Sequence, residues 1–166
     1  EVLPVINTME KLYRMPLSPA RFKAYLQLLQ GDTKGDMILP IGAYNPMAKA
    51  HILQKLLELK QMNAEKLMSD ALQELNTTIG HASNINIKVV LNLADDLKGG
   101  WTNRYTTDYD SKFKINALVS RNFCAPHFWS GESYTPELIQ ERTVAYARRT
   151  LYWKKHGKPH TLEDHL

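Results

Sequence analysis

The sequence contains a single cysteine, Cys124, so a disulfide cannot form within the chain. It has no apolar run close to the roughly 18 residues that cross a membrane, so we expect a soluble protein with no membrane span. Its first residues lack the basic segment and apolar core of a signal peptide. The compartment stays unknown, with the cytoplasm favoured because a lone cysteine is compatible with a reducing environment.

The chain also lacks the short motifs that identify common enzyme classes. It has no phosphate-binding loop, dinucleotide fingerprint, nucleophile elbow or zinc-protease motif. His156, His160 and His165 lie close together in the sequence, but Gly157 and Pro159 interrupt the helix that would place them on one face. We therefore predict no metal site, and the sequence leaves the cofactor and any catalytic residues unknown.

The length and the composition favour one folded unit. A chain of 166 residues with 43% hydrophobic side chains can bury a core without a disulfide or a metal. We predict a single globular domain over 1–166. The alternative is a fragment of a longer chain truncated after Leu166, because Thr161 and Asp164 are spaced like a capping box at the start of a further helix.

Helical periodicity dominates the sequence. Apolar residues recur three and four positions apart in several segments, and the pairs Ser18-Pro19 and Thr135-Pro136 are typical helix starts, with a capping side chain followed by a proline. These signals predict five main helices, at 3–15, 18–31, 45–62, 63–80 and 135–156.

Two segments alternate between apolar and polar residues, which is typical of half-buried strands. They are 85–93 and 112–120, and 37–41 is a third candidate that Pro40 restricts to a sheet edge. The predicted fold class is α+β, with the helices packed on one face of a small antiparallel sheet. So small a sheet leaves exposed edges, which makes a homodimer through a sheet edge plausible.

The segment 95–111, between the two predicted strands, is the candidate functional loop. It is longer than an ordinary hairpin loop, and long loops in compact domains tend to be functional or disordered. Its aromatic residues argue against disorder, and Gly99-Gly100 would let backbone N–H groups approach a phosphate. The alternative is a structural loop that packs on the sheet edge. The predicted ligand-binding residues are Lys98, Gly99, Gly100, Trp101, Asn103, Arg104, Tyr105, Asp108, His127 and Trp129.

Three functions from different classes remain open. The first is binding of a small polar or anionic organic ligand through 95–111, with enzymatic activity undecided. The net charge of +4 favours anionic over cationic partners. The second is a non-catalytic interaction or oligomerisation module of a larger protein. The third is nucleic-acid binding through the basic helix 136–156, which we rank last because a basic stripe alone is a weak criterion.

Overall fold

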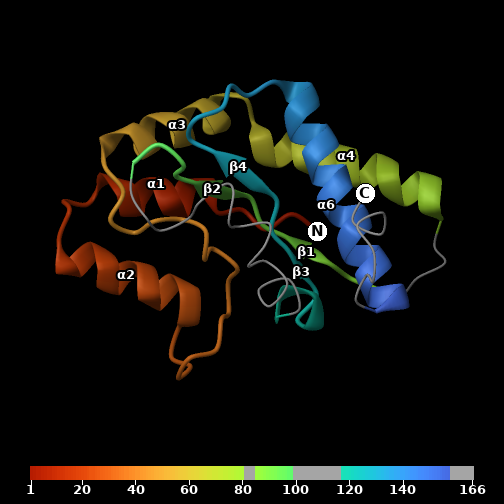
Figure 1. Ribbon diagram of the computed structural model, residues 1–166, viewed down its shortest axis with the longest axis horizontal. Coiled ribbons are helices and arrows are strands. Elements are labelled where there is room, and N and C mark those ends of the chain that lie inside the picture. The colour runs from red at the N-terminus through yellow and green to blue at the C-terminus, as the bar shows by residue number, and fades with distance from the viewer. Residues whose placement is uncertain (81–84, 99–116, 158–166) are drawn as a thin grey trace.

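The computed structural model describes residues 1–80, 85–98 and 117–157, and these form an α+β fold (Figure 1). Helices lie on either side of a small central group of strands. The backbone is also helical at 117–120. The named helices are α1 (Ile6–Arg14), α2 (Pro19–Gln30), α3 (Ala50–Gln61), α4 (Ala64–Ile79) and α6 (Pro136–His156), and the strands are β1 (Lys88–Val89), β2 (Asn92–Ala94), β3 (Phe123–Cys124) and β4 (His127–Trp129).

The five predicted helices are confirmed, and two of them begin with the predicted caps. The Ser18 side chain accepts a hydrogen bond from the backbone N–H of Arg21 at 3.5 Å, and Pro19 occupies the first turn of α2. The Thr135 hydroxyl accepts from the backbone N–H of Leu138 at 3.1 Å at the start of α6. These local signals act within one turn, which is why the sequence alone reveals them.

Helix α3 begins later than predicted. The pair Asn45-Pro46 forms a turn, in which the Asn45 side chain accepts from the Met47 N–H at 2.9 Å, and the helix starts only at Ala50. The turn is a capping arrangement without a helix behind it, because short polar side chains cap turns as readily as helices.

The predicted antiparallel sheet is wrong: the strands pair in parallel. Strand β1 pairs with β3, and β2 pairs with β4, with Leu93 opposite Phe128. The pairs form two small sheets, and the same two chain segments are also linked by backbone bonds from Val90 N–H to Cys124 O and from Asn92 N–H to Pro126 O, both at 2.9 Å. Alternation of apolar residues identifies a strand but says nothing about the direction of its partner.

The predicted strand at 112–120 is also wrong in its described part, because 117–120 are helical and 112–116 lie outside the described residues. The true partner strands are β3 and β4, which the sequence does not reveal because strands of two and three residues are too short to show a period. A parallel partner needs a crossover of about a dozen or more residues, and the chain between β2 and β3 is long enough for one.

The third predicted strand, 37–41, is wrong, because the backbone of these residues is irregular. The N-terminal residues take the edge position instead. Val2 forms a parallel bridge with Val89, the Leu3 N–H donates to Val89 O at 2.9 Å, and the Val89 N–H donates to Glu1 O at 2.7 Å. Helix α1 therefore begins at Ile6, a few residues after the predicted start, because the preceding segment is used as an edge strand.

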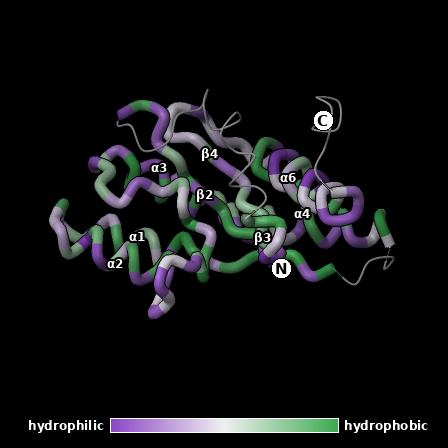
Figure 2. The backbone as a smooth tube through the Cα atoms, turned by 60° about the horizontal axis from the view of Figure 1, so that its bottom comes forward, coloured by the Kyte–Doolittle hydropathy of each residue, from purple (hydrophilic) through white to green (hydrophobic). Residues whose placement is uncertain are grey.

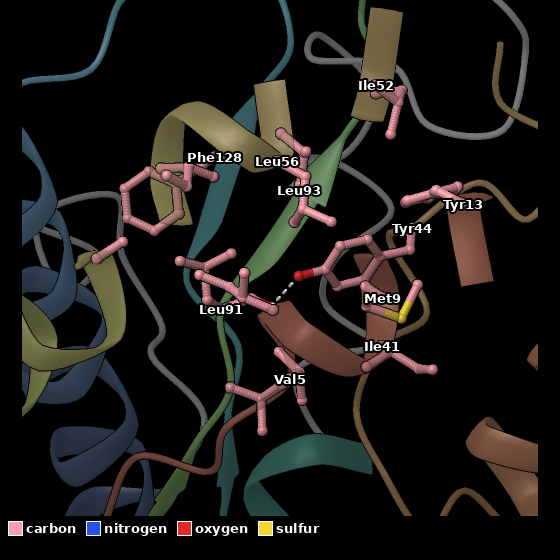
Figure 3. Packing of buried hydrophobic residues seen from close by; sticks show 14 of the residues in the cluster. Val5, Met9, Tyr13, Ile41, Tyr44, Ile52, Leu56, Leu91, Leu93 and Phe128 are labelled. Atoms are coloured by element: carbon pink, nitrogen blue, oxygen red, sulfur yellow. Dashed lines mark hydrogen bonds between the residues drawn. The ribbon is translucent and has the colours of Figure 1, made fainter. Parts of the chain in front are cut away.

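Apolar residues concentrate at the strands β2 and β3, while the outer helices alternate between hydrophobic and hydrophilic segments (Figure 2). In the core, side chains of the strands meet those of α1 and α3 (Figure 3). The Tyr44 ring is buried among them, and its hydroxyl donates to Leu91 O at 2.7 Å. This bond satisfies the one polar atom of a fully buried aromatic side chain, as burial requires. The labelled core residues include Met9, Ile52, Leu56, Leu93 and Phe128.

Candidate functional site

The strand pair β2–β4 separates a fully apolar face from a face with polar side chains. Leu93 and Phe128, which pair in register, belong to the main core. The flanking pair Asn92 and His127 must point the opposite way, because successive side chains of a strand alternate between faces. Asn92 and His127 both line a cavity on that second face.

This cavity, which we call the strand-face cavity, has a volume of about 380 Å³. Its walls come from the end of α2 and the chain after it, from the two strands, and from 117–121. Most of the lining is apolar, and four side chains bring polar groups: Gln30, Asn92, Arg121 and His127. The other lining residues are Leu29, Gly35, Met37, Pro40, Gly42, Ala43, Ala117, Leu118 and Ala125.

Asn92 fixes one wall of the strand-face cavity. Its side chain is buried, with the amide Nδ2 donating to Pro40 O at 2.8 Å and to Val90 O at 3.2 Å. Its Oδ1 accepts from the Ala43 N–H at 3.2 Å. All of these partners are backbone atoms. The Asn92 side chain therefore holds the 40–43 segment against β2, and both of its polar atoms are hydrogen-bonded to the backbone.

His127 presents a half-buried imidazole to the strand-face cavity. Its Nδ1 lies 2.7 Å from Ala125 O, and because a carbonyl only accepts, Nδ1 carries the hydrogen. The ring is stacked on Tyr146 of α6, with centroids 6.1 Å apart and planes at 20°, and is tilted against Trp129 at the same centroid distance. Packing on two aromatic rings holds the imidazole in one orientation.

Arg121 is the fixed positive charge of the strand-face cavity. Its Nη2 pairs with Asp36 Oδ1 at 3.2 Å, and its Nη1 donates to Ala117 O at 3.4 Å. The Arg121 side chain is 41% exposed and the Asp36 side chain 76% exposed, so the ion pair lies at the surface. Surface pairs of this kind contribute about 0–1 kcal/mol.

A second polar cluster lies just beyond the carboxyl ends of β2 and β4. Asp95, which directly follows β2, is 1% exposed and accepts on both carboxylate oxygens. Its Oδ2 lies 2.9 Å from His51 Nε2, near the start of α3. Its Oδ1 accepts from the Ser130 hydroxyl at 2.8 Å, from the Leu97 N–H at 3.0 Å and from the Lys98 N–H at 3.1 Å.

These hydrogen bonds keep Asp95 ionised. Burial by itself would raise the pKa of the Asp95 carboxyl, but the bonds from His51, from Ser130 and from the two backbone N–H groups outweigh it and lower the pKa below its usual value. An ionised carboxylate only accepts, so His51 Nε2 carries a hydrogen. In the neutral imidazole, Nδ1 is then the atom able to accept a proton.

The cluster is not a nucleophile–base–acid relay. Ser130 donates to Asp95 and not to His51, so the hydroxyl is not placed for activation by the imidazole. Asp96, the neighbour of Asp95, accepts from the Gly131 N–H at 2.7 Å. The two carboxylates thus tie the chain after β2 to the chain after β4.

The predicted ligand-binding residues are only partly described. His127 lines the strand-face cavity. Trp129 and Lys98 are not among the residues that line the cavity. Trp129 is buried in a small cluster with Ala43 and Ala94, and Lys98 is exposed at the Asp95 turn. Gly99, Gly100, Trp101, Asn103, Arg104, Tyr105 and Asp108 lie outside the described residues.

The sequence did not predict the other polar residues of the strand-face cavity or those of the Asp95 cluster. Arg121 and Asn92 carried no signal beyond their positions near predicted strands. His51 lies 44 positions from Asp95 on a helix, and nothing in the sequence links the two. The one available clue was that Asp95 follows a buried strand directly, since the end of a strand is where polar side chains often collect.

Cys124 is buried in β3, and burial raises the pKa of its thiol to about 11, although Thr150 and Arg149 act in the opposite direction. Such a thiol is protonated at neutral pH and a poor nucleophile. Within the described ranges, no group of three or more His, Cys, Asp or Glu side chains is placed to hold a metal ion. The described helices include none that is both long and apolar enough to cross a membrane.

Comparison of the chain with protein-family models, with curated proteins and with solved structures finds no match. The strand-face cavity and the Asp95 cluster are therefore the features of the structure that bear on function.

Proposed function

We propose that the protein binds a small organic ligand in the strand-face cavity. The observation that carries the proposal is the cavity itself, a volume of about 380 Å³ with a mainly apolar lining and a few polar side chains. Ligand sites have volumes of about 300–1,000 Å³ and this kind of lining. Taking roughly 30 Å³ for a water-sized unit, the volume suits a ligand of about a dozen non-hydrogen atoms.

The walls of the cavity favour a site that is formed before the ligand arrives. Asn92 fastens the 40–43 segment to β2 through backbone partners, and stacking on Tyr146 fixes His127. A preformed site loses little conformational freedom on binding, so more of the contact energy appears as affinity.

The proposal is tested by a fragment screen followed by amide chemical shifts in NMR spectra. A binding fragment should shift the amides of lining residues such as Leu118, Ala125 and His127. Ala117→Phe places a ring in the cavity and should abolish these shifts, whereas Ala145→Phe on the exposed side of α6 should leave them. Leu118→Trp serves as a second filling variant if thermal unfolding shows that Ala117→Phe is not folded.

If no fragment shifts the lining amides, or if shifts survive in the folded filling variants, the cavity is not the binding site.

A further inference from the structure

We propose that the ligand of the strand-face cavity is an amphipathic organic monoanion, with an apolar body in the cavity and a carboxylate paired with Arg121. This inference rests on the proposed function and names the chemical class of its ligand. It is carried by the distribution of charge and apolar surface around the cavity.

The first observation is the sign of the charge. Among the described residues that line the cavity, Arg121 and His127 have basic side chains and none is acidic. A guanidinium carries its positive charge permanently in proteins. A lining of this kind attracts an anion and disfavours a cation, because one sign of charge beside low-dielectric walls concentrates the field.

The second observation is the apolar remainder of the wall. Its side chains come from α2, from the chain after it, from 117–118 and from the strand segment before β4. They offer no charged group with which a strongly polar body could pair. The side chains are Leu29, Met37, Pro40, Leu118 and Ala125.

The third observation is that the partner of Arg121 can be displaced. Asp36 lies between the lining residues Gly35 and Met37, and its side chain points largely into solvent, 76% exposed. A surface pair contributes about 0–1 kcal/mol, whereas a planar guanidinium binds an incoming carboxylate with two parallel hydrogen bonds. A ligand carboxylate that is partly shielded from water would therefore replace Asp36.

The probes for the test are octanoate, 1-octanol and octylamine, which share a chain and differ in the charge of the head group. Affinities are measured by calorimetry below the concentration at which the probes form micelles. We expect octanoate to bind about tenfold or more tightly than 1-octanol, and octylamine to bind weakest.

Three variants test whether Arg121 causes the preference for octanoate over 1-octanol. In Arg121→Gln, octanoate and 1-octanol should bind with equal affinity. Arg148→Gln, which removes the same charge from an exposed position of α6, should leave the preference intact. Asp36→Asn, a change at a solvent-exposed side chain, should strengthen octanoate binding a few-fold because it removes the competing carboxylate.

The failures of the two proposals can be told apart. Equal binding of octanoate and 1-octanol at the lining amides would overturn the anion class and leave the cavity as a site. A preference lost equally in Arg121→Gln and Arg148→Gln would overturn the role of Arg121. Absence of any fragment from the cavity would overturn both proposals.

Discussion

At the scale of single residues, Asp95 is where the fold concentrates its polar bonding. A 1% exposed carboxylate accepts hydrogen bonds from one imidazole, one hydroxyl and two backbone N–H groups. Removal of the carboxylate would break all of these bonds, although the Ser130 hydroxyl also lies 3.2 Å from Asp96 Oδ1, and the loss of hydrogen bonds to a buried charged group is costly. The residue thus joins the start of α3, the end of β2 and the end of β4.

Replacing Asp95 by Ala should lower the free energy of unfolding by about 3 kcal/mol, because it removes several hydrogen bonds made to a buried carboxylate. The measurement is denaturant unfolding at pH 7. Asp70→Ala on α4 is the matched control, since the Asp70 side chain is 49% exposed and pairs with Lys66 on the same helix. A cost for Asp95→Ala no larger than for this control would contradict the interpretation.

The same carboxylate gives the protein a pH dependence of stability. The pKa of Asp95 is lower in the folded state than in the unfolded chain, where it is about 3.9. Its contribution is therefore fully present above the unfolded pKa and is lost as the pH falls through the folded pKa. The free energy of unfolding is measured between roughly pH 6 and pH 3, a range that brackets this unfolded value. It should fall less steeply with acid in Asp95→Asn than in the wild type.

Gly131 lies close to the side chains of Asp96 and Leu97. A Cβ at this position would lie 2.8 Å from Asp96 Oδ1 and 3.1 Å from Leu97 Cδ2. Gly131→Ala should therefore destabilise the fold by about 1–2 kcal/mol. Gly42→Ala is the control, because its Cβ would meet no atom within 4 Å. Thermal unfolding compares the two, and equal midpoints would show that the 95–98 turn yields to the added methyl group.

At the scale of elements, the helix caps were readable from the sequence and differ in quality. The Thr135 hydroxyl accepts at 3.1 Å, whereas the Ser18 hydroxyl accepts at 3.5 Å, the long limit for such a bond. Replacing a capping side chain by Ala costs about 0.5–2 kcal/mol. We expect Thr135→Ala to lie in the upper part of this range and Ser18→Ala in the lower part, as measured by denaturant unfolding. The reverse order would mean that contacts beyond the cap decide the cost.

The basic helix α6 uses part of its charge inside the molecule. Lys154 donates to Val119 O at 2.9 Å, and the Arg149 guanidinium lies over the Tyr146 ring, 4.5 Å from its centroid. Arg148 and Lys155 are exposed. Nucleic-acid binding through this helix stays a prediction, as does a homodimer through a sheet edge.

At the scale of the whole molecule, Cys124 reports on opening of the fold. The thiol is buried and its pKa is raised to about 11. Reaction with a disulfide reagent at pH 8 (about three pH units below this pKa) should therefore be slower than in the urea-unfolded chain by orders of magnitude, and its rate should rise with urea as the protein opens. If the thiol of the folded protein, without urea, reacts as fast as that of the urea-unfolded chain, β3 is not buried beneath α6.

The sequence predicted much of the fold and little of the candidate site. Helices were readable because their period and caps are local. Strand 85–93 was partly right, since β1 and β2 fall within or beside it, but its partner was placed at 112–120 instead of at β3 and β4. Of the predicted ligand-binding residues that the structure describes, His127 lines the cavity, whereas Arg121 and Asn92 were not predicted.

The helices, the caps and the α+β class could be predicted from the sequence, because they depend on interactions within a few residues. The parallel direction of the strands, the use of Glu1–Leu3 as an edge, and the contact of His51 with Asp95 arise only when the chain is folded. It also decided the strand-face cavity, where Arg121 and His127 share a wall with the end of α2. These features join segments far apart in the chain, and no local pattern encodes which distant segments will be neighbours.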